Sequence, residues 1–429
     1  MLIQITISNF MSFNKETTFS MFPTSSQTKG DHIIEDNTGK KVCALPICSI
    51  YGANASGKSN FISAIEFLQE FVLRGEKITN TENEIPVIPF LLDESCLKKP
   101  SRFELLFKFQ GVAYTYGFVV STTRVEEEWL FAYYTSKESL VFIRKWNKKL
   151  KQYEFDFGSK LRSSISTEVA KWTSEKSLFL SFAYDKKPVE KIIAPIYQWF
   201  QNIVIVHNLA KYKDLPFKLA ENEDFARFVS KYLSEIDTGI NNITVQKEEL
   251  TEEKLQSLPA ILKREIEKEN IKNNDSKHYV LTLLSYHQNL QGKPQPFSLY
   301  MESDGTIRIL HLLPILYLLT QQEHGKIFFI DELDNSLHPV LSYWFLENFL
   351  RLRKNSASQL IFSTHDTNLL TSDLFRKDEI CFTEKDDGGA THFVRFSEYK
   401  TSDGLNWENG YISGRFGGIP VLKAKHEFE

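Results

Sequence analysis

The first residues of the chain alternate between apolar and polar positions. Ile3, Ile5 and Ile7 fall on one side of an extended segment, and Gln4 and Thr6 fall on the other. This period of two predicts a strand with one buried face. The chain therefore begins with a strand that packs against a core.

The same alternation returns in four later segments. Residues 103–109 and 112–120 are two apolar runs joined by Gln110-Gly111, which predicts a hairpin with a glycine turn. Residues 125–134 and 140–146 predict two further strands. We therefore expect an antiparallel β unit in the first part of the chain.

The middle of the chain changes to a helical period with many charged positions. Residues 224–236 and 252–268 place apolar side chains at helical spacing. We expect residues 151–294 to form a mostly helical lobe. This lobe would be inserted between residues 1–150 and residues 295–429, which would form the two halves of an α/β domain.

One apolar segment leads into a glycine-rich loop. Residues 42–51 are mostly apolar despite Pro46 and predict a buried strand. The loop that follows is Gly52-Ala53-Asn54-Ala55-Ser56-Gly57-Lys58-Ser59, which has the pattern G-x-x-x-x-G-K-S. Residues 59–74 then predict a helix. This strand, loop and helix form the context that a Walker A phosphate-binding loop requires.

The chemistry of such a loop assigns roles to its residues. Loop amides and the positive end of the following helix both attract a phosphate group. Lys58 would reach the β- and γ-phosphates of ATP, and Ser59 would ligate Mg²⁺. The candidate nucleotide-contacting residues of this loop are Gly52, Asn54, Ala55, Ser56, Gly57, Lys58, Ser59 and Asn60.

A second apolar segment ends on two carboxylates. Residues 326–330 predict a buried strand, and Asp331 and Glu332 follow it. This is the form of a Walker B motif, in which Asp331 would hold Mg²⁺ next to Ser59. Glu332 would act as the general base for the attacking water. The alternative role for these two acids is to cap the helix that follows.

Composition limits the class of protein. A chain of 429 residues is expected to contain two or three domains, and its net charge of −4 gives no overall basic surface for nucleic acid. The four cysteines are scattered without a C-x-x-C pair, which favours reduced thiols. No apolar run is long enough to span a bilayer, and the N-terminus lacks a basic segment, so we do not expect it to be a signal peptide. We expect a cytoplasmic protein.

The order of these motifs resembles that of ATP-binding-cassette ATPases, specifically the SMC/RecF/OLD-like branch. Asp334 and Ser336 follow the Walker B acids, and His365 ends an apolar run after them. The resemblance implies an ABC-type P-loop fold, a D-loop at Asp334 and Ser336, and a catalytic switch histidine at His365. Lys58, Glu332 and His365 are therefore the candidate catalytic residues, and no Q-loop glutamine is assigned.

The resemblance also implies a signature segment that completes the nucleotide site of a second copy. Residues 302–306 open an apolar helix and are the candidate. Ser303 and Gly305 would contact the phosphate of the other protomer. The segment departs from the L-S-G-G-Q pattern at Asp304 and Thr306, so the resemblance assigns phosphate contact to Ser303 and Gly305 and not to those two residues.

Both ends of the chain extend the resemblance. Residues 7–13 are similar to the N-F-R-S-F motif of SMC/RecF-like ATPases, with Met11 in place of arginine. Residues 126–130 and 409–420 resemble motifs of the bacterial AAA15/AAA21 group, the Rlo-type ATPases. That resemblance implies a role in anti-phage defence beside an effector, a nuclease or toxin encoded nearby.

The resulting hypothesis is an ATPase that forms a homodimer or higher homo-oligomer around ATP and Mg²⁺ and switches a partner effector. One alternative is an OLD-like nuclease, but only 64 residues follow His365 (429 − 365), without a clear acid cluster. Another is a DNA-binding clamp or DNA-structure sensor. The trigger, the effector and the turnover rate are not predicted.

Overall fold

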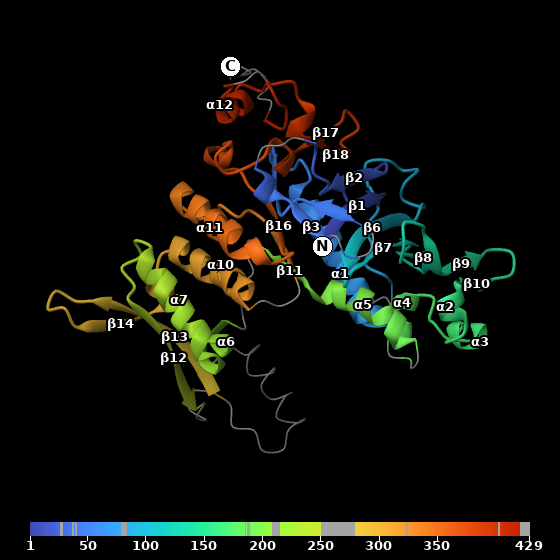
Figure 1. The fold of residues 1–429 in the computed structure, drawn as a ribbon, viewed down its shortest axis with the longest axis horizontal. Helices are drawn as coiled ribbons and strands as arrows, with labels where there is room; N and C mark the ends of the chain where they lie inside the picture. The colour runs from blue at the N-terminus through green and yellow to red at the C-terminus, as the bar shows by residue number, and fades with distance from the viewer. Residues whose placement is uncertain are drawn as a thin grey trace, which may run out of the picture. The chain divides into compact units, whose positions relative to one another are not determined.

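A computed structural model describes residues 1–25, 29–36, 38, 41–78, 84–184, 186, 189–207, 215–249, 279–321, 325–401 and 404–420 (Figure 1). The chain divides into two compact units. The first unit comprises Met1–Asn208, Gln322–Asp334 and Pro339–Glu429, and the second comprises Leu209–Gln321 and Asn335–His338. Each unit is described separately below.

The first unit contains a seven-stranded antiparallel sheet. Its strands are β1 (Leu2–Ser8), β2 (Thr17–Ser20), β6 (Ser101–Phe109), β7 (Val112–Val120), β8 (Val125–Tyr133), β9 (Ser139–Asn147) and β10 (Gln152–Phe157). Their order across the sheet is β10-β9-β8-β7-β6-β1-β2. The strands follow one another in a meander, except where β1 lies between β6 and β2.

The first unit also contains a six-stranded sheet that is mainly parallel. Its strands are β5 (Ile47–Gly52), β11 (Ile203–Val206), β15 (Ile327–Ile330), β16 (Gln359–Ser363), β17 (Ile380–Lys385) and β18 (Thr391–Arg395). The order is β11-β15-β16-β5-β17-β18, and only the β17–β18 pair is antiparallel. The strand that precedes the glycine loop therefore lies inside the sheet.

Helix α1 (Lys58–Arg74) packs into the core that joins the two sheets. Its side chains Phe61, Ile65, Leu68 and Val72 are buried there, as their helical spacing predicts. The other helices of this unit are α2 (Ser159–Arg162), α3 (Thr167–Ala170), α4 (Phe179–Tyr184), α5 (Glu190–Gln201), α11 (Pro339–Leu352) and α12 (Trp407–Ile412). Of these, α4 and α5 both contact α1.

The second unit combines a small sheet with helices. The strands β12 (Asn242–Glu249), β13 (Tyr279–Gln288) and β14 (Pro294–Ser298) form an antiparallel sheet in that order. Helices α6 (Leu215–Glu221) and α7 (Glu223–Glu235) pack on β12, and α7 contacts α10 (Asp304–Thr320). The Phe225 and Tyr317 rings lie 4.9 Å apart between α7 and α10.

The structure confirms the α/β class and the antiparallel β unit. It differs for residues 42–51, where one strand was predicted. Two strands form instead, because β4 (Val42–Ala44) ends before Pro46 and pairs with β3 (Ile34–Asp36), while β5 begins at Ile47. Proline lacks the N–H that a continuous central strand needs, so it divides the segment.

The units are also divided differently from the predicted domains. Residues 151–208 were predicted to belong to a helical lobe, but they lie in the first unit, where β10 extends the antiparallel sheet. The second unit carries three strands as well as helices and extends to residue 321. The predicted helix at residues 252–268 lies outside the described residues.

Among the described residues, no helix has the length and hydropathy that crossing a membrane requires.

Candidate functional site

Four parallel strands bring the predicted motifs to one edge of the six-stranded sheet. Strands β15, β16, β5 and β17 are neighbours and point the same way, so the residues that follow them share that edge. A pocket of about 470 Å³ lies there. It is lined by Asn54, Ala55, Ser56, Gly57, Lys58, Ser59, Asn60, Glu332, His365 and Lys385. Segments more than 300 residues apart in sequence therefore meet in one site.

The glycine loop has a shape that only glycine permits at Gly57. Its φ is +112°, and a Cβ built there would lie 2.2 Å from Oγ1 of Thr391 and 2.9 Å from Oγ of Ser12. A side chain would therefore collide with both hydroxyl groups. Gly57 caps the N-terminus of α1, so the helix amides face the pocket.

Lys58 occupies the inside of this loop. Its Nζ donates hydrogen bonds to the carbonyl oxygens of Gly52, at 2.7 Å, and Ala53, at 3.1 Å. Burial lowers the pKa of Lys58, while the charges of nearby acids, first Asp331 and then Glu332, act in the opposite direction. The Lys58 ammonium and the Glu332 carboxylate therefore line the same pocket, and Asp331 is near enough to act on Lys58.

Two threonines of β17 and β18 hold the loop in place. The Ser56 and Thr383 hydroxyls are hydrogen-bonded at 2.6 Å. Thr391 Oγ1 lies 2.8 Å from Ser12 Oγ and 2.8 Å from the Ser56 carbonyl. The loop is thus attached to the sheet and to the turn after β1.

The two acids after β15 are oriented by one buried serine. Ser363, the last residue of β16, donates a hydrogen bond from Oγ to Asp331 Oδ1 at 2.6 Å. The same Oγ accepts the backbone N–H of Glu332 at 2.8 Å. Glu332 has a φ of 47°, in the left-handed region that non-glycine residues rarely adopt. Ser363 therefore supports a sharp change of chain direction between the two carboxylates.

His365 lies at the rim of the pocket and is exposed. Its backbone N–H donates to the two carboxylate oxygens of Asp334 at 3.2 and 3.3 Å. Desolvation and then the charge of Lys58 lower the pKa of the imidazole. The neutral form is thus favoured at neutral pH, which leaves one ring nitrogen as a hydrogen-bond acceptor and the other as a donor.

The residues present fit a magnesium nucleotide. A loop of amides with no room for a Cβ at Gly57, an inward-facing ammonium and adjacent carboxylates is the donor set that phosphates and Mg²⁺ need. Ser59 lines the pocket, and Asp331 follows a strand that ends at the same edge. Within the described ranges, no group of three or more His, Cys, Asp or Glu side chains forms a separate metal site.

The predicted signature residues lie in the second unit. Ser303 caps α10, and its Oγ accepts the N–H of Thr306 at 3.1 Å. Gly305 lies close to Ser336 of the candidate D-loop. A Cβ at Gly305 would be 2.8 Å from the carbonyl oxygen of Ser336. Ser336 itself has a left-handed φ of 62°. Gly305 of the candidate signature and Ser336 of the candidate D-loop therefore pack against each other within the second unit.

Four residues near the loop were not predicted from the sequence: Thr383, Thr391, Lys385 and Ser363. Threonine is typical of any strand, so Thr383 and Thr391 give no local signal. Lys385 follows the apolar run of β17 and projects to the same edge as the motifs. Only the parallel arrangement of the strands identifies it as part of the site.

The C-terminal motif packs beside the glycine loop. A second cavity of about 480 Å³ is lined by Ala53–Ser56, Thr383–Lys385, Gly414 and Gly417–Ile419. The Tyr411 ring stacks on Phe382 with centroids 5.3 Å apart, and its hydroxyl donates to the Gly418 carbonyl at 3.0 Å. Residues 409–420 therefore form one wall of a space that adjoins the loop.

The two other motifs make structural contacts. Asn9 Nδ2 donates to the carbonyls of Cys96 at 3.0 Å and Lys99 at 2.8 Å, which fixes the connection before β6. Glu128 is fully buried and accepts the N–H groups of Phe179 at 2.5 Å and Leu180 at 3.0 Å. It therefore caps the first turn of α4.

Comparison with known proteins identifies the sequence family. The profile described as "AAA domain, putative AbiEii toxin, Type IV TA system" matches residues 47–371, which is about three quarters of the chain. No curated protein matches the chain.

Solved structures with a similar fold include the SMC head domain from Thermotoga maritima, with 13% identity and a TM-score of 0.40 over 92% of this chain and 98% of that chain. Another is an SMC head bound to the C-terminal winged-helix domain of ScpA, with 14% identity and a TM-score of 0.42 over 92% of this chain and 97% of that one.

Proposed function

Because the chain belongs to the AAA_21 family of AAA domains, we propose that it hydrolyses ATP between two copies of itself and thereby switches a partner effector. The observation that carries this proposal is the single pocket shared by Lys58, Glu332 and His365. It supports a site in which the loop binds phosphates, the acids face them, and the histidine lies at the rim.

The proposed roles follow from the contacts. Lys58 and the loop amides neutralise the β- and γ-phosphates, and Glu332 takes the proton of the attacking water. His365 contacts the γ-phosphate. Mg²⁺, held by Ser59 and Asp331, would supply the positive charge that offsets charge on the phosphate oxygens. Ser303 and Gly305 of a second copy complete the site, so ATP joins two protomers.

The defence setting is also part of the proposal. The family description names a putative toxin of a type IV toxin–antitoxin system. Residues 409–420 resemble the Rlo-type branch and lie against the glycine loop, where they are suited to sense its state. We assign the protein to that branch and to the cytoplasm, with a nuclease or toxin as the effector.

A substitution at Glu332 tests the ATPase proposal. Glu332→Gln is expected to reduce phosphate release by about 100-fold or more, because general-base catalysis contributes about 10²–10⁴-fold. ATP binding should persist, so the variant should accumulate as an ATP-bound dimer in size-exclusion chromatography with light scattering. Glu70→Gln, which changes a partly exposed carboxylate on α1 that does not line the pocket, is the control. Unchanged turnover in Glu332→Gln would remove Glu332 from its role.

The effector is tested by co-expression with the neighbouring genes. A nuclease or toxin that co-purifies in ATP and is released in ADP would support the switch. A parallel assay of ATP turnover with and without double-stranded DNA distinguishes the effector switch from a DNA clamp. DNA should stimulate hydrolysis only if the protein is a DNA clamp.

A further inference from the structure

A second polar pocket lies in the first unit, among residues that do not line the glycine-loop pocket. It has a volume of about 450 Å³, within the range of about 300–1,000 Å³ that is typical of small-molecule sites. Its walls come from residues 31–32, from α11 with the turn that follows it, and from residues 373–374. None of these residues belongs to the motifs described above.

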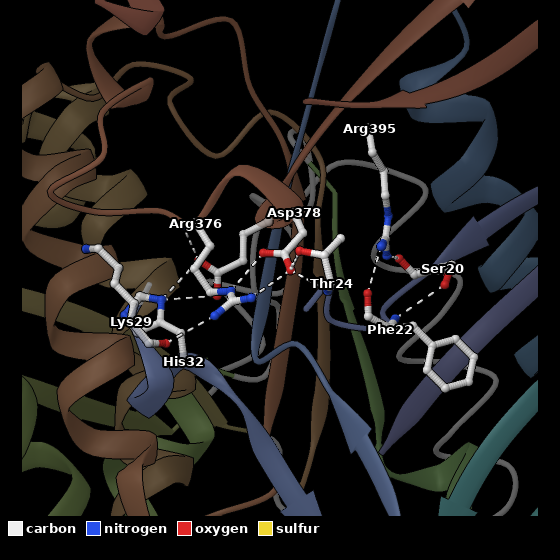
Figure 2. Close-up of polar contacts among 9 residues, drawn as sticks. Ser20, Phe22, Thr24, Lys29, His32, Arg376, Asp378 and Arg395 are labelled. Atoms are coloured by element: carbon white, nitrogen blue, oxygen red, sulfur yellow. Dashed lines mark hydrogen bonds and ion pairs between the residues drawn. The ribbon is translucent and has the colours of Figure 1, made fainter. Parts of the chain in front are cut away.

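The buried charges behind this pocket are paired (Figure 2). Arg376 binds Asp378 through two hydrogen bonds of 2.8 Å, and Thr24 donates to the same carboxylate from its N–H and hydroxyl. His32 Nδ1 lies 3.0 Å from both carboxylate oxygens of Glu379. Arg376 and Asp378 therefore pair with each other, and so do His32 and Glu379.

Arg353 is different. Arg353 is 5% exposed and lines the pocket, and its Nε is buried without a hydrogen-bond partner among the described residues. Across the described ranges of the chain, its guanidinium makes no hydrogen bond or ion pair. Burial lowers the pKa of Arg353, although Glu379 and then Asp31 act in the opposite direction. Burying a guanidinium without a bonded anion costs folding free energy. An anionic ligand in the pocket would offset that cost.

The rim of the pocket restricts what that ligand is. Arg351 and Lys354 add positive charge, but Asp31, Glu347 and Asp373 are exposed carboxylates at the same opening. A polyanion such as nucleic acid would be repelled by these three acids. A small molecule with one anionic group and one ammonium or other donor group matches both sets of charges.

We propose that this pocket binds a small molecule through an oxyanion, phosphate or carboxylate, held by Arg353, with a donor group of the ligand facing the rim acids. Guanidinium forms paired hydrogen bonds with either oxyanion. The site is separate from the glycine loop, and the proposal does not depend on ATP hydrolysis.

The test measures thermal unfolding with three probes at millimolar concentration: inorganic phosphate, phosphoethanolamine and glutamate. All chains carry Lys58→Ala, which removes the phosphate-binding ammonium of the glycine loop. Phosphoethanolamine or glutamate should raise Tm by about 2 °C or more, because a ligand that binds only the folded state stabilises it. The more effective of the two shows whether the oxyanion is phosphate or carboxylate.

Arg353→Leu should abolish the shift, whereas Arg227→Leu, at an exposed arginine of α7, should preserve it. Without a probe, Arg353→Leu should unfold at the same or a higher temperature, because it removes an unpaired buried charge. The proposal is overturned if no probe raises Tm, if the shift survives in Arg353→Leu, or if that variant loses several degrees without a probe, which would make the guanidinium structural.

Discussion

At the scale of single residues, the two acids after β15 depend on one hydroxyl group. Ser363 is fully buried and bonds both the Asp331 carboxylate and the Glu332 backbone. Ser363→Ala should therefore misplace both acids and raise the Mg²⁺ concentration needed for half-maximal ATPase activity by about 10–100-fold, as loss of an outer-shell partner does at metal sites. A magnesium titration of turnover measures this.

The matched control is Ser49→Ala. Ser49 is equally buried in the neighbouring strand β5, but its hydroxyl donates to the Glu379 carbonyl, at 3.2 Å, and not to the acids. Its loss should cost stability without changing the magnesium requirement. Equal magnesium curves for Ser363→Ala and the wild type would show that Ser363 does not position the metal-binding acid.

A second residue-scale prediction concerns acid stability. Burial would raise the pKa of Asp378, but hydrogen bonds from Arg376 and Thr24 lower it below its ordinary value of 3.8. Because the folded-state pKa lies below the unfolded one, the stability is present above pH 3.8 and is lost as the pH falls through the folded-state pKa. Asp378→Ala should cost about 3–5 kcal/mol at pH 7, since it breaks a buried pair.

Urea unfolding at pH 7, 5 and 3 checks the sign of this effect. The difference between wild type and Asp378→Ala should be the same at pH 7 and pH 5, which both lie above 3.8, and smaller at pH 3. Asp224→Ala, which removes an exposed partner of Arg227, should differ little from the wild type at any pH. A difference for Asp378→Ala that grows toward pH 3 would contradict the assignment.

At the scale of elements, strand β18 acts on the glycine loop through Thr391. Thr391→Val keeps the shape but removes the hydroxyl that contacts Ser12 and Ser56. Because a buried partner left unsatisfied costs about 1–3 kcal/mol, the nucleotide dissociation constant should rise about 10-fold or more. Thr173→Val is the control, since the buried Thr173 hydroxyl has no hydrogen-bond partner in the part of the chain that the structure describes. Equal nucleotide binding by both variants would show that β18 does not shape the loop.

The sequence predicted those elements whose signal is local. The alternation in residues 103–120 and the apolar spacing of Phe61, Ile65, Leu68 and Val72 are set by short-range burial, and the structure places them as predicted. The division of residues 42–51 by Pro46 was a local signal as well, but it was outweighed by the apolar run. The boundary predicted at residue 150 lies instead near residue 208. Strand β10 continues the antiparallel sheet beyond residue 150 by pairing with β9, a long-range contact that the sequence does not reveal.

The site shows the same division between local and long-range signals. The motif residues from Asn54 to Asn60, with Glu332 and His365, line one pocket because parallel strands end at one edge. Thr391 and Ser363 carry no motif and act only through contacts across the sheet. Arg353 directly follows the amphipathic helix α11, so its sequence context does not distinguish it from a surface arginine. Its buried Nε, which has no hydrogen-bond partner among the described residues, is visible only in the structure.

At the scale of the whole molecule, the proposed dimer predicts that two inactive variants restore activity when they are mixed. A site contained within one chain would not allow this. If each site joins the glycine loop of one copy to Ser303 of the other, Lys58→Ala and Ser303→Arg should each be inactive alone. In an equal mixture about half of the dimers are heterodimers, and each would have one intact site out of two. Turnover should therefore recover to about a quarter of the wild-type value.

This recovery is measured as phosphate release after the two purified variants are mixed and equilibrated with ATP. The control places both substitutions in one chain and mixes it with the wild type. If the sites are shared, both sites of those heterodimers carry a defect, and only the wild-type homodimers, about a quarter of the dimers, stay active. If each chain has its own complete site, half of the chains keep full activity. A mixture of Lys58→Ala and Ser303→Arg that stays inactive would contradict the shared site, because both altered chains would then carry a defect in the only site they use.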